Sequence, residues 1–85
     1  MNEQQLKEEL REMIAATIEI DDFADDENFV QDLGVDSMMA LEIVARIEKA
    51  YRIQIAEEEL TNLQSLNQVV AVVIKIMNEN ETKEV

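Results

Sequence analysis

Apolar residues recur along this chain at helical spacing, with charged residues set away from them. The first such stripe is Leu6, Leu10, Met13, Ile14, Thr17 and Ile18, of which only Thr17 is polar. The second is Ala40, Ile43, Val44, Ile47 and Tyr51. These two stripes predict one helix over residues 3–18 and another over residues 36–51.

Two further helices are predicted in the second half of the chain. A short helix covers residues 57–62, with Leu60 turned inward, and a longer one covers residues 65–78. Ser65 stands three residues before Gln68, which is the spacing of a capping box at a helix start.

The apolar run over residues 69–74 is rich in β-branched residues and would also suit a strand. A lone strand without a partner is not stable, so a buried helix is favoured. The tail 79–85 is expected to fray. The predicted fold is therefore all-α: a four-helix bundle of three longer helices and one short helix, in a single domain over residues 1–85.

The connection between the first two helices, residues 19–36, is long and acidic. It holds eight carboxylates and no basic residue, and loops beyond roughly 12 to 15 residues are often functional. Four apolar residues are expected to pin this loop to the bundle: Phe23, Phe29, Val30 and Leu33.

An EF-hand calcium loop in this segment is excluded by its spacing. Such a loop needs oxygen ligands at alternate positions and a glycine at the sixth. Counting from Asp21 makes Phe23 the third residue, and counting from Asp25 makes Phe29 the fifth. Neither start puts glycine sixth, so no metal site is predicted, although weak, diffuse divalent binding stays open.

The charge balance limits the partners. Twenty acidic and seven basic residues give a net charge of −13, which disfavours nucleic acid and anionic membranes. The longest apolar run, residues 69–74, is far too short to insert across a bilayer. The charge suits basic partner surfaces and a monomer that repels its own copies, or it serves solubility alone.

The chain contains neither Cys nor His. This excludes a thiolate nucleophile, a Ser-His pair and a zinc site with the usual ligands. No pair of carboxylates is singled out by its context, so the protein is not expected to be an enzyme. The first residues are acidic rather than basic, so no signal peptide is expected and the cytoplasm is the expected location.

The acidic loop ends in a short motif that leads directly into the second helix. Gly34, the only glycine, permits a backbone conformation or close approach closed to other residues. Asp36 stands where an N-cap belongs, and Ser37 then falls at the first helical position. A phosphate ester on Ser37 would be favoured by the helix dipole and by unpaired N–H groups.

The stretch Leu33-Gly34-Val35-Asp36-Ser37-Met38-Met39-Ala40-Leu41-Glu42 resembles the attachment motif of acyl carrier proteins, and the resemblance extends over nearly the whole chain. It implies that a phosphopantetheinyl transferase moves the arm of coenzyme A onto Ser37, with Asp36 and Gly34 supporting the motif. The thiol of this 4'-phosphopantetheine cofactor would carry acyl groups as thioesters between fatty-acid, polyketide or specialised lipid biosynthetic enzymes.

The second helix has more apolar residues than one buried stripe needs. A face that docks basic surfaces of acyl-processing enzymes is one interpretation, and a helix buried on two sides is the other. The residues assigned to this docking face are Met38, Met39, Leu41, Glu42, Ala45 and Glu48, with Asp36 at its rim.

Four residues depart from the pattern common in the family: Met39, Arg46, Lys49 and Ala56. Met39, Arg46 and Lys49 leave the second helix less acidic than usual, and Ala56 stands where a proline is common. A dedicated pathway is therefore as open as ordinary fatty-acid synthesis. A peptidyl or aminoacyl carrier and an acidic helical adaptor without a prosthetic group are the alternatives. We also expect the acyl chain to be partly sequestered among the second, third and fourth helices.

Overall fold

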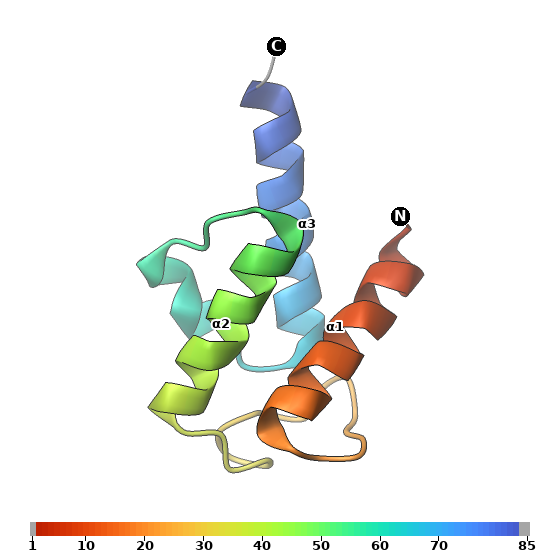
Figure 1. Ribbon diagram of the computed structural model, residues 1–85, viewed down its shortest axis with the longest axis vertical. Helices are drawn as coiled ribbons and strands as arrows, with labels where there is room; N and C mark the ends of the chain where they lie inside the picture. Colours follow the sequence, from red (N-terminus) through yellow and green to blue (C-terminus); the bar gives the residue numbers. More distant parts are fainter. Residues whose placement is uncertain (1, 84–85) are drawn as a thin grey trace.

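The computed structural model describes the backbone of residues 2–83 and the side chains of residues 2–79. Its elements are α1 (Glu3–Ile18), α2 (Ser37–Tyr51), the 3-10 helix η1 (Glu57–Asn62) and α3 (Leu66–Lys83), with no strand in this part of the chain. In Figure 1, α1 descends to the acidic loop, and both α2 and α3 run upward. The predicted all-α class, with a long loop between the first two helices, is confirmed.

The last helix continues further than its apolar pattern indicated. We predicted an end near Asn78 and fraying over residues 79–85, but α3 continues to Lys83. Extending an existing helix adds one hydrogen bond for each residue ordered, and it needs no apolar contact. Residues 84–85 lie outside the described residues.

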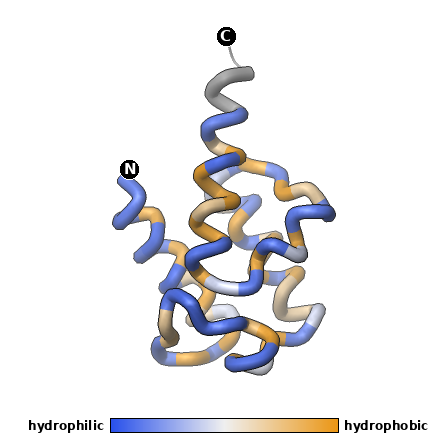
Figure 2. The backbone as a smooth tube through the Cα atoms, turned by 180° about the vertical axis from the view of Figure 1, so that it is seen from behind, coloured by the Kyte–Doolittle hydropathy of each residue, from blue (hydrophilic) through white to orange (hydrophobic). Residues whose placement is uncertain are grey.

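One apolar core joins the three long helices. In α1 the buried residues are Leu6, Leu10, Ile14 and Ile18. In α2 they are Ile43 and Ile47, and α3 contributes Leu66, Val69, Val70 and Val73. α1 packs against both α2 and α3, while η1 packs against α3. Figure 2 shows the resulting alternation of hydrophobic and hydrophilic stretches along each helix.

Side chains cap the starts of α1 and α3. Asn2 caps α1: its Oδ1 accepts from the Gln5 amide at 2.8 Å, and Gln5 Oε1 accepts from the Asn2 amide at 3.2 Å. At α3, Ser65 Oγ accepts from the Gln68 amide at 3.3 Å, as its spacing predicted. Gln68 Oε1 instead accepts from the Gln64 amide, so this box is displaced by one residue.

The acidic loop is held on α1 by two cations. Arg11 donates to the Phe23 carbonyl at 2.6 Å and forms an ion pair with Asp25. Lys7 lies 2.5 Å from the same Asp25 carboxylate. The Arg11 guanidinium also lies 5.6 Å from the centre of the Phe23 ring, whose edge meets Phe29 with the ring centres 5.8 Å apart. Charge and aromatic packing therefore fix the loop at the same place.

Backbone hydrogen bonds tie the loop to the segment that opens α3. The Phe29 amide donates to the Gln64 carbonyl at 2.8 Å, and the Asn67 amide donates to the Asp25 carbonyl at 3.1 Å. The second bond satisfies an amide in the first turn of α3, which has no partner within the helix. Of the residues expected to pin the loop, Val30 was assigned wrongly because its side chain is 61% exposed.

Asp25 makes the attachment of the loop sensitive to pH. Hydrogen bonds from Lys7 and then Arg11 lower the pKa of Asp25 below its ordinary 3.8. Since the pKa of Asp25 is lower in the folded state than in the unfolded chain, its ionised carboxylate stabilises the fold at every pH above the unfolded pKa. The contribution is lost as the pH falls through the folded value.

We predict that Asp25→Asn removes this dependence. The free energy of unfolding, measured by urea denaturation, should differ between wild type and variant by a constant amount from pH 7 to about pH 5. The difference should then shrink toward pH 3. Asp26→Asn is the control, because Asp26 is exposed and forms no ion pair with any side chain that the structure describes. A difference for Asp25→Asn that stays constant down to pH 3 would contradict the assignment.

Candidate functional site

The start of α2 presents Ser37 to solvent. Asp36 has extended backbone angles (φ −93°), and its carboxylate accepts from the Met39 amide at 2.9 Å. Its carbonyl accepts from the Ala40 amide at 2.9 Å. Ser37 is consequently the first helical residue, and it is exposed, as predicted.

Gly34 makes the turn that leads into this helix start. Its φ of +69° lies in the left-handed region, and a Cβ built there would meet nothing within 4 Å. The requirement for glycine is therefore one of backbone conformation and not of close approach. The next residue, Val35, is buried and donates its amide to the Phe29 carbonyl at 2.8 Å, which fixes the turn against the loop.

The donors around Ser37 suit a phosphate ester. The carboxylate of Asp36 accepts a hydrogen bond from the Met39 amide. The amides of Ser37 and Met38 donate to no group within residues 2–83. They belong to the first turn, at the positive end of the helix dipole. An anionic group on the exposed hydroxyl of Ser37 would meet both unpaired donors, so the residues present fit a phosphate-linked prosthetic group.

An apolar groove begins beside Ser37. Its volume is about 290 Å³, and it is lined by Ser37, Phe29, Ala40, Leu41, Ile43, Val44, Ile47, Leu60, Leu63 and Val69. Ser37 is the only polar residue in that lining. The lining residues come from α2, η1, the acidic loop and α3, so no single stretch of sequence could reveal them.

α2 exposes apolar side chains on its outer face. Met38 is 79% and Leu41 58% exposed, and Ala45 is exposed on the same face. A helix buried on two sides is therefore wrong. Exposed large apolar residues grouped on one helix face are typical of protein-binding surfaces.

The other residues assigned to the docking face are placed differently from one another. Glu42 is exposed and pairs with Arg46 at 3.2 Å. Met39 is half-buried and packs against the core. Glu48 is half-buried too, because its Oε2 accepts from the Ile55 amide at 2.8 Å. The acidic rim on α2 is thus largely occupied by contacts within the protein.

Two further properties concern the described residues alone. They contain no group of three His, Cys, Asp or Glu side chains arranged to hold a metal ion. None of their helices is long and apolar enough to cross a membrane.

Comparison with known proteins identifies the class of the site. Residues 8–73 match the family model of the phosphopantetheine attachment site. The chain is 50% identical over 62 residues to the polyketide-8 synthase acyl carrier protein 2 of Streptomyces avermitilis, which covers 71% of each chain. It is 38% identical over 73 residues to the acyl carrier protein of Streptomyces coelicolor, covering 82% of this chain and 79% of the relative.

The fold agrees with solved structures. A type-II acyl carrier protein from Streptomyces verticillus, involved in bleomycin biosynthesis, superposes with a TM-score of 0.79 at 20% identity, covering 88% of this chain and 89% of that one. A putative acyl carrier protein from Mycobacterium tuberculosis gives a TM-score of 0.76 at 21% identity, covering 81% and 95%. The chain therefore belongs to the phosphopantetheine-attachment family, as one of its acyl carrier proteins. Its cofactor is covalently attached 4'-phosphopantetheine, and it carries acyl groups.

We predict that Gly34→Ala destabilises the protein by about 1 kcal/mol, because alanine disfavours positive φ while no atom opposes its Cβ. Gly34→Asn should cost less, since asparagine tolerates the left-handed region better. Urea denaturation of the two variants measures both effects. An alanine variant as stable as wild type would show that the turn relaxes to negative φ.

Proposed function

We propose that Ser37 is the residue that carries the phosphopantetheine arm. The supporting observation is its place as an exposed first residue of α2, beside two unpaired amides. The chain has one other serine, Ser65, whose hydroxyl accepts from the Gln68 amide at the start of α3. Ser65 is half-buried and already has a structural role.

The chain's own residues would hold and present the arm. Asp36 and Gly34 set the direction in which Ser37 leaves the loop, and the unpaired amides of Ser37 and Met38 would stabilise the phosphate. The thiol at the end of the arm forms thioesters, a reactivity that a chain without cysteine lacks. We infer that the protein performs no catalysis itself and that partner enzymes supply the chemistry.

We further propose that the pathway served is of the polyketide type. The identity of 50% to the carrier named for a polyketide synthase, against 38% to the acyl carrier protein of Streptomyces coelicolor, favours a dedicated carrier. We propose that the protein works as a monomer in the cytoplasm, where coenzyme A and acyl-processing enzymes are found. Its charge of −13 opposes self-association. Loading assays with acyl and aminoacyl donors distinguish this function from that of an aminoacyl carrier.

Intact-mass measurement tests the attachment residue. After incubation with coenzyme A and a broad-specificity phosphopantetheinyl transferase, the wild type should gain the mass of one phosphopantetheine and Ser37→Ala none. Ser65→Ala is the matched control and should gain the full mass, although loss of its cap costs roughly 1 kcal/mol of stability. Modification of Ser37→Ala would refute the proposal, as would an unmodified wild type.

The apolar groove beside Ser37 would shelter the first part of a bound acyl chain. Its volume of about 290 Å³ is just below the range for ligand sites, about 300 to 1,000 Å³, which suits part of an acyl chain. Ala40 and Leu41 line it on α2, and Leu60 and Leu63 line it at η1. Burying methylene groups there would contribute roughly 0.8 kcal/mol each.

We predict that attaching an octanoyl group shifts the amide NMR signals of Leu60, Leu63 and Val69 relative to the unacylated arm. An acetyl group, too short to fill the groove, is the control. Ala40→Leu should reduce the octanoyl shifts, because the added methyl groups occupy the groove. Identical spectra for the octanoyl and unacylated forms would show that the chain stays in solvent.

A further inference from the structure

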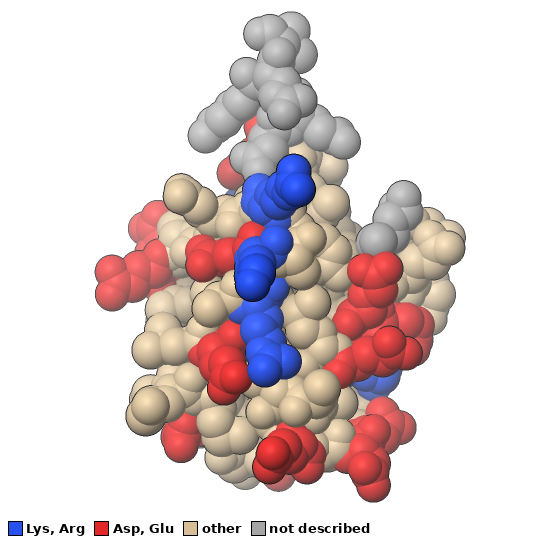
Figure 3. All heavy atoms as spheres, in the orientation of Figure 1, with Lys and Arg blue, Asp and Glu red and all other residues tan. Residues whose placement is uncertain are grey.

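Basic side chains are unevenly distributed over this acidic protein. Three of them follow one another at intervals of three residues at the end of α2: Arg46, Lys49 and Arg52. We call these three the basic row. All are exposed, and Figure 3 shows basic side chains in a line on the face where α2 lies in Figure 1, with acidic side chains on both sides.

The other cations whose side chains are described are engaged in the fold. Lys7 and Arg11 hold Asp25 of the acidic loop, and Lys75 pairs with Glu59 at 3.5 Å. In the basic row Arg46 forms an ion pair with Glu42 at 3.2 Å. Lys49 and Arg52 form no ion pair with any side chain between residues 2 and 79.

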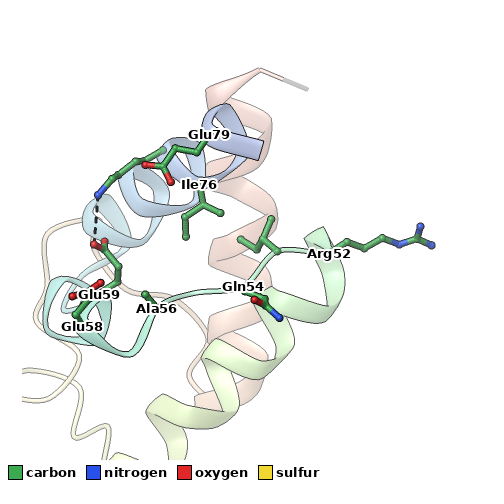
Figure 4. A pocket seen from close by; sticks show the side chains of 9 residues that line it. Arg52, Gln54, Ala56, Glu58, Glu59, Ile76 and Glu79 are labelled. Carbon is green, nitrogen blue, oxygen red and sulfur yellow. Dashed lines mark hydrogen bonds and ion pairs between the residues drawn. The ribbon is translucent and has the colours of Figure 1, made fainter. Parts of the chain in front are cut away.

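Apart from Glu42, the described carboxylates close to the basic row in sequence or in space form no ion pair with it. Glu48, between Arg46 and Lys49, is held by the Ile55 amide. Arg52 lines a pocket of about 660 Å³ together with Glu58, Glu59 and Glu79. Figure 4 shows, however, that the Arg52 side chain points away from these three carboxylates. Glu59 forms its ion pair with Lys75 instead. The charges of Lys49 and Arg52 are therefore exposed to solvent and unpaired among the described side chains.

A groove adjoins the basic row. It has a volume of about 670 Å³ and is lined by Ala45, Glu48 and Lys49 of α2 and by the segment 53–56. Ala45 also belongs to the exposed face that starts at Met38. The outer surface of α2 thus changes along its length, from apolar side chains near Ser37 to cations and a groove at the far end.

The row is too distant from Ser37 to contact the phosphate of the arm. Lys49 is twelve residues further along α2, which at 1.5 Å per residue is about 18 Å. A surface at that distance can orient a partner but cannot act on the site of attachment.

We propose that the basic row docks a carboxylate-bearing surface of the condensing enzyme that extends the acyl group, in contrast to the basic partner surfaces that the net charge alone suits. Because the rest of the chain is acidic, an acidic surface is attracted only opposite this row and is repelled elsewhere. The partner consequently binds α2 in one direction, with an apolar contact at Met38 and carboxylates at Lys49 and Arg52. This inference rests on the proposed carrier function and adds the chemistry of the partner.

The test compares charge-reversed variants that all have the same net charge and differ only in where the reversal lies. Lys49→Glu and Arg52→Glu are assayed against Lys75→Glu, which changes the net charge equally but lies on α3. Each holo protein is first made with the transferase and confirmed by mass, and its fold is checked by thermal unfolding. The probe enzyme is the condensing enzyme of the polyketide-8 synthase of Streptomyces avermitilis, with its KM for the acyl carrier as the readout.

We expect Lys49→Glu and Arg52→Glu to raise KM roughly 3- to 10-fold each, and Lys75→Glu to leave it within about 2-fold. The neutral variants Lys49→Gln and Arg52→Gln should fall between, and added salt should raise the KM of the wild type more than that of the reversed variants.

A lower KM in the reversed variants would mean that the facing surface is basic and would overturn the proposal. An unchanged KM, or a probe enzyme that does not accept the wild type, would overturn it too. If sedimentation shows that the wild type forms dimers and that Lys49→Glu does not, the basic row binds a second copy of the chain and the proposal is wrong. In all these cases, modification of wild type but not of Ser37→Ala would leave the carrier function intact.

Discussion

The attachment of the acidic loop to α1 is the interaction on which the rest of the structure depends. The loop has eight carboxylates and no cation of its own, so the charges that hold it must come from another element. Arg11 and Lys7 supply them, and the buried Phe23 and Phe29 place the same segment in the core. Without this anchor, repulsion among the carboxylates would favour an extended loop and weaken the contacts that fix where Ser37 emerges.

α2 combines two functions on opposite sides. Ile43 and Ile47 face inward and tie the helix to the core, while Met38 and Leu41 remain exposed. If α2 bears the prosthetic group, as proposed, this division keeps the group accessible while the helix stays packed on the core. The groove beside Ser37 lies between the two sides and is lined by residues of α2, η1 and α3, which is why its lining is apolar yet open to solvent.

The helix ends show where local patterns are informative and where they are not. The start of α2 was predicted because aspartate followed by serine creates a cap within a few residues of chain. The ends of α1 and α2 carry no glycine; Glu19 and Arg52 instead adopt positive φ of 58° and 56°. The apolar stripes stop at these ends, but the positive φ itself has no glycine to signal it in the sequence.

The sequence by itself determined the helical class, the position of the loop and the place of Ser37 at the start of α2, because helical periodicity and capping act over a few neighbouring residues. Only the tertiary structure decided which contacts join distant segments. Val30 and Phe29 are both apolar loop residues, yet one is exposed and the other buried. Glu48 and Lys49 are adjacent charges, yet the Ile55 amide holds the first, while the second forms no ion pair among the side chains of residues 2–79.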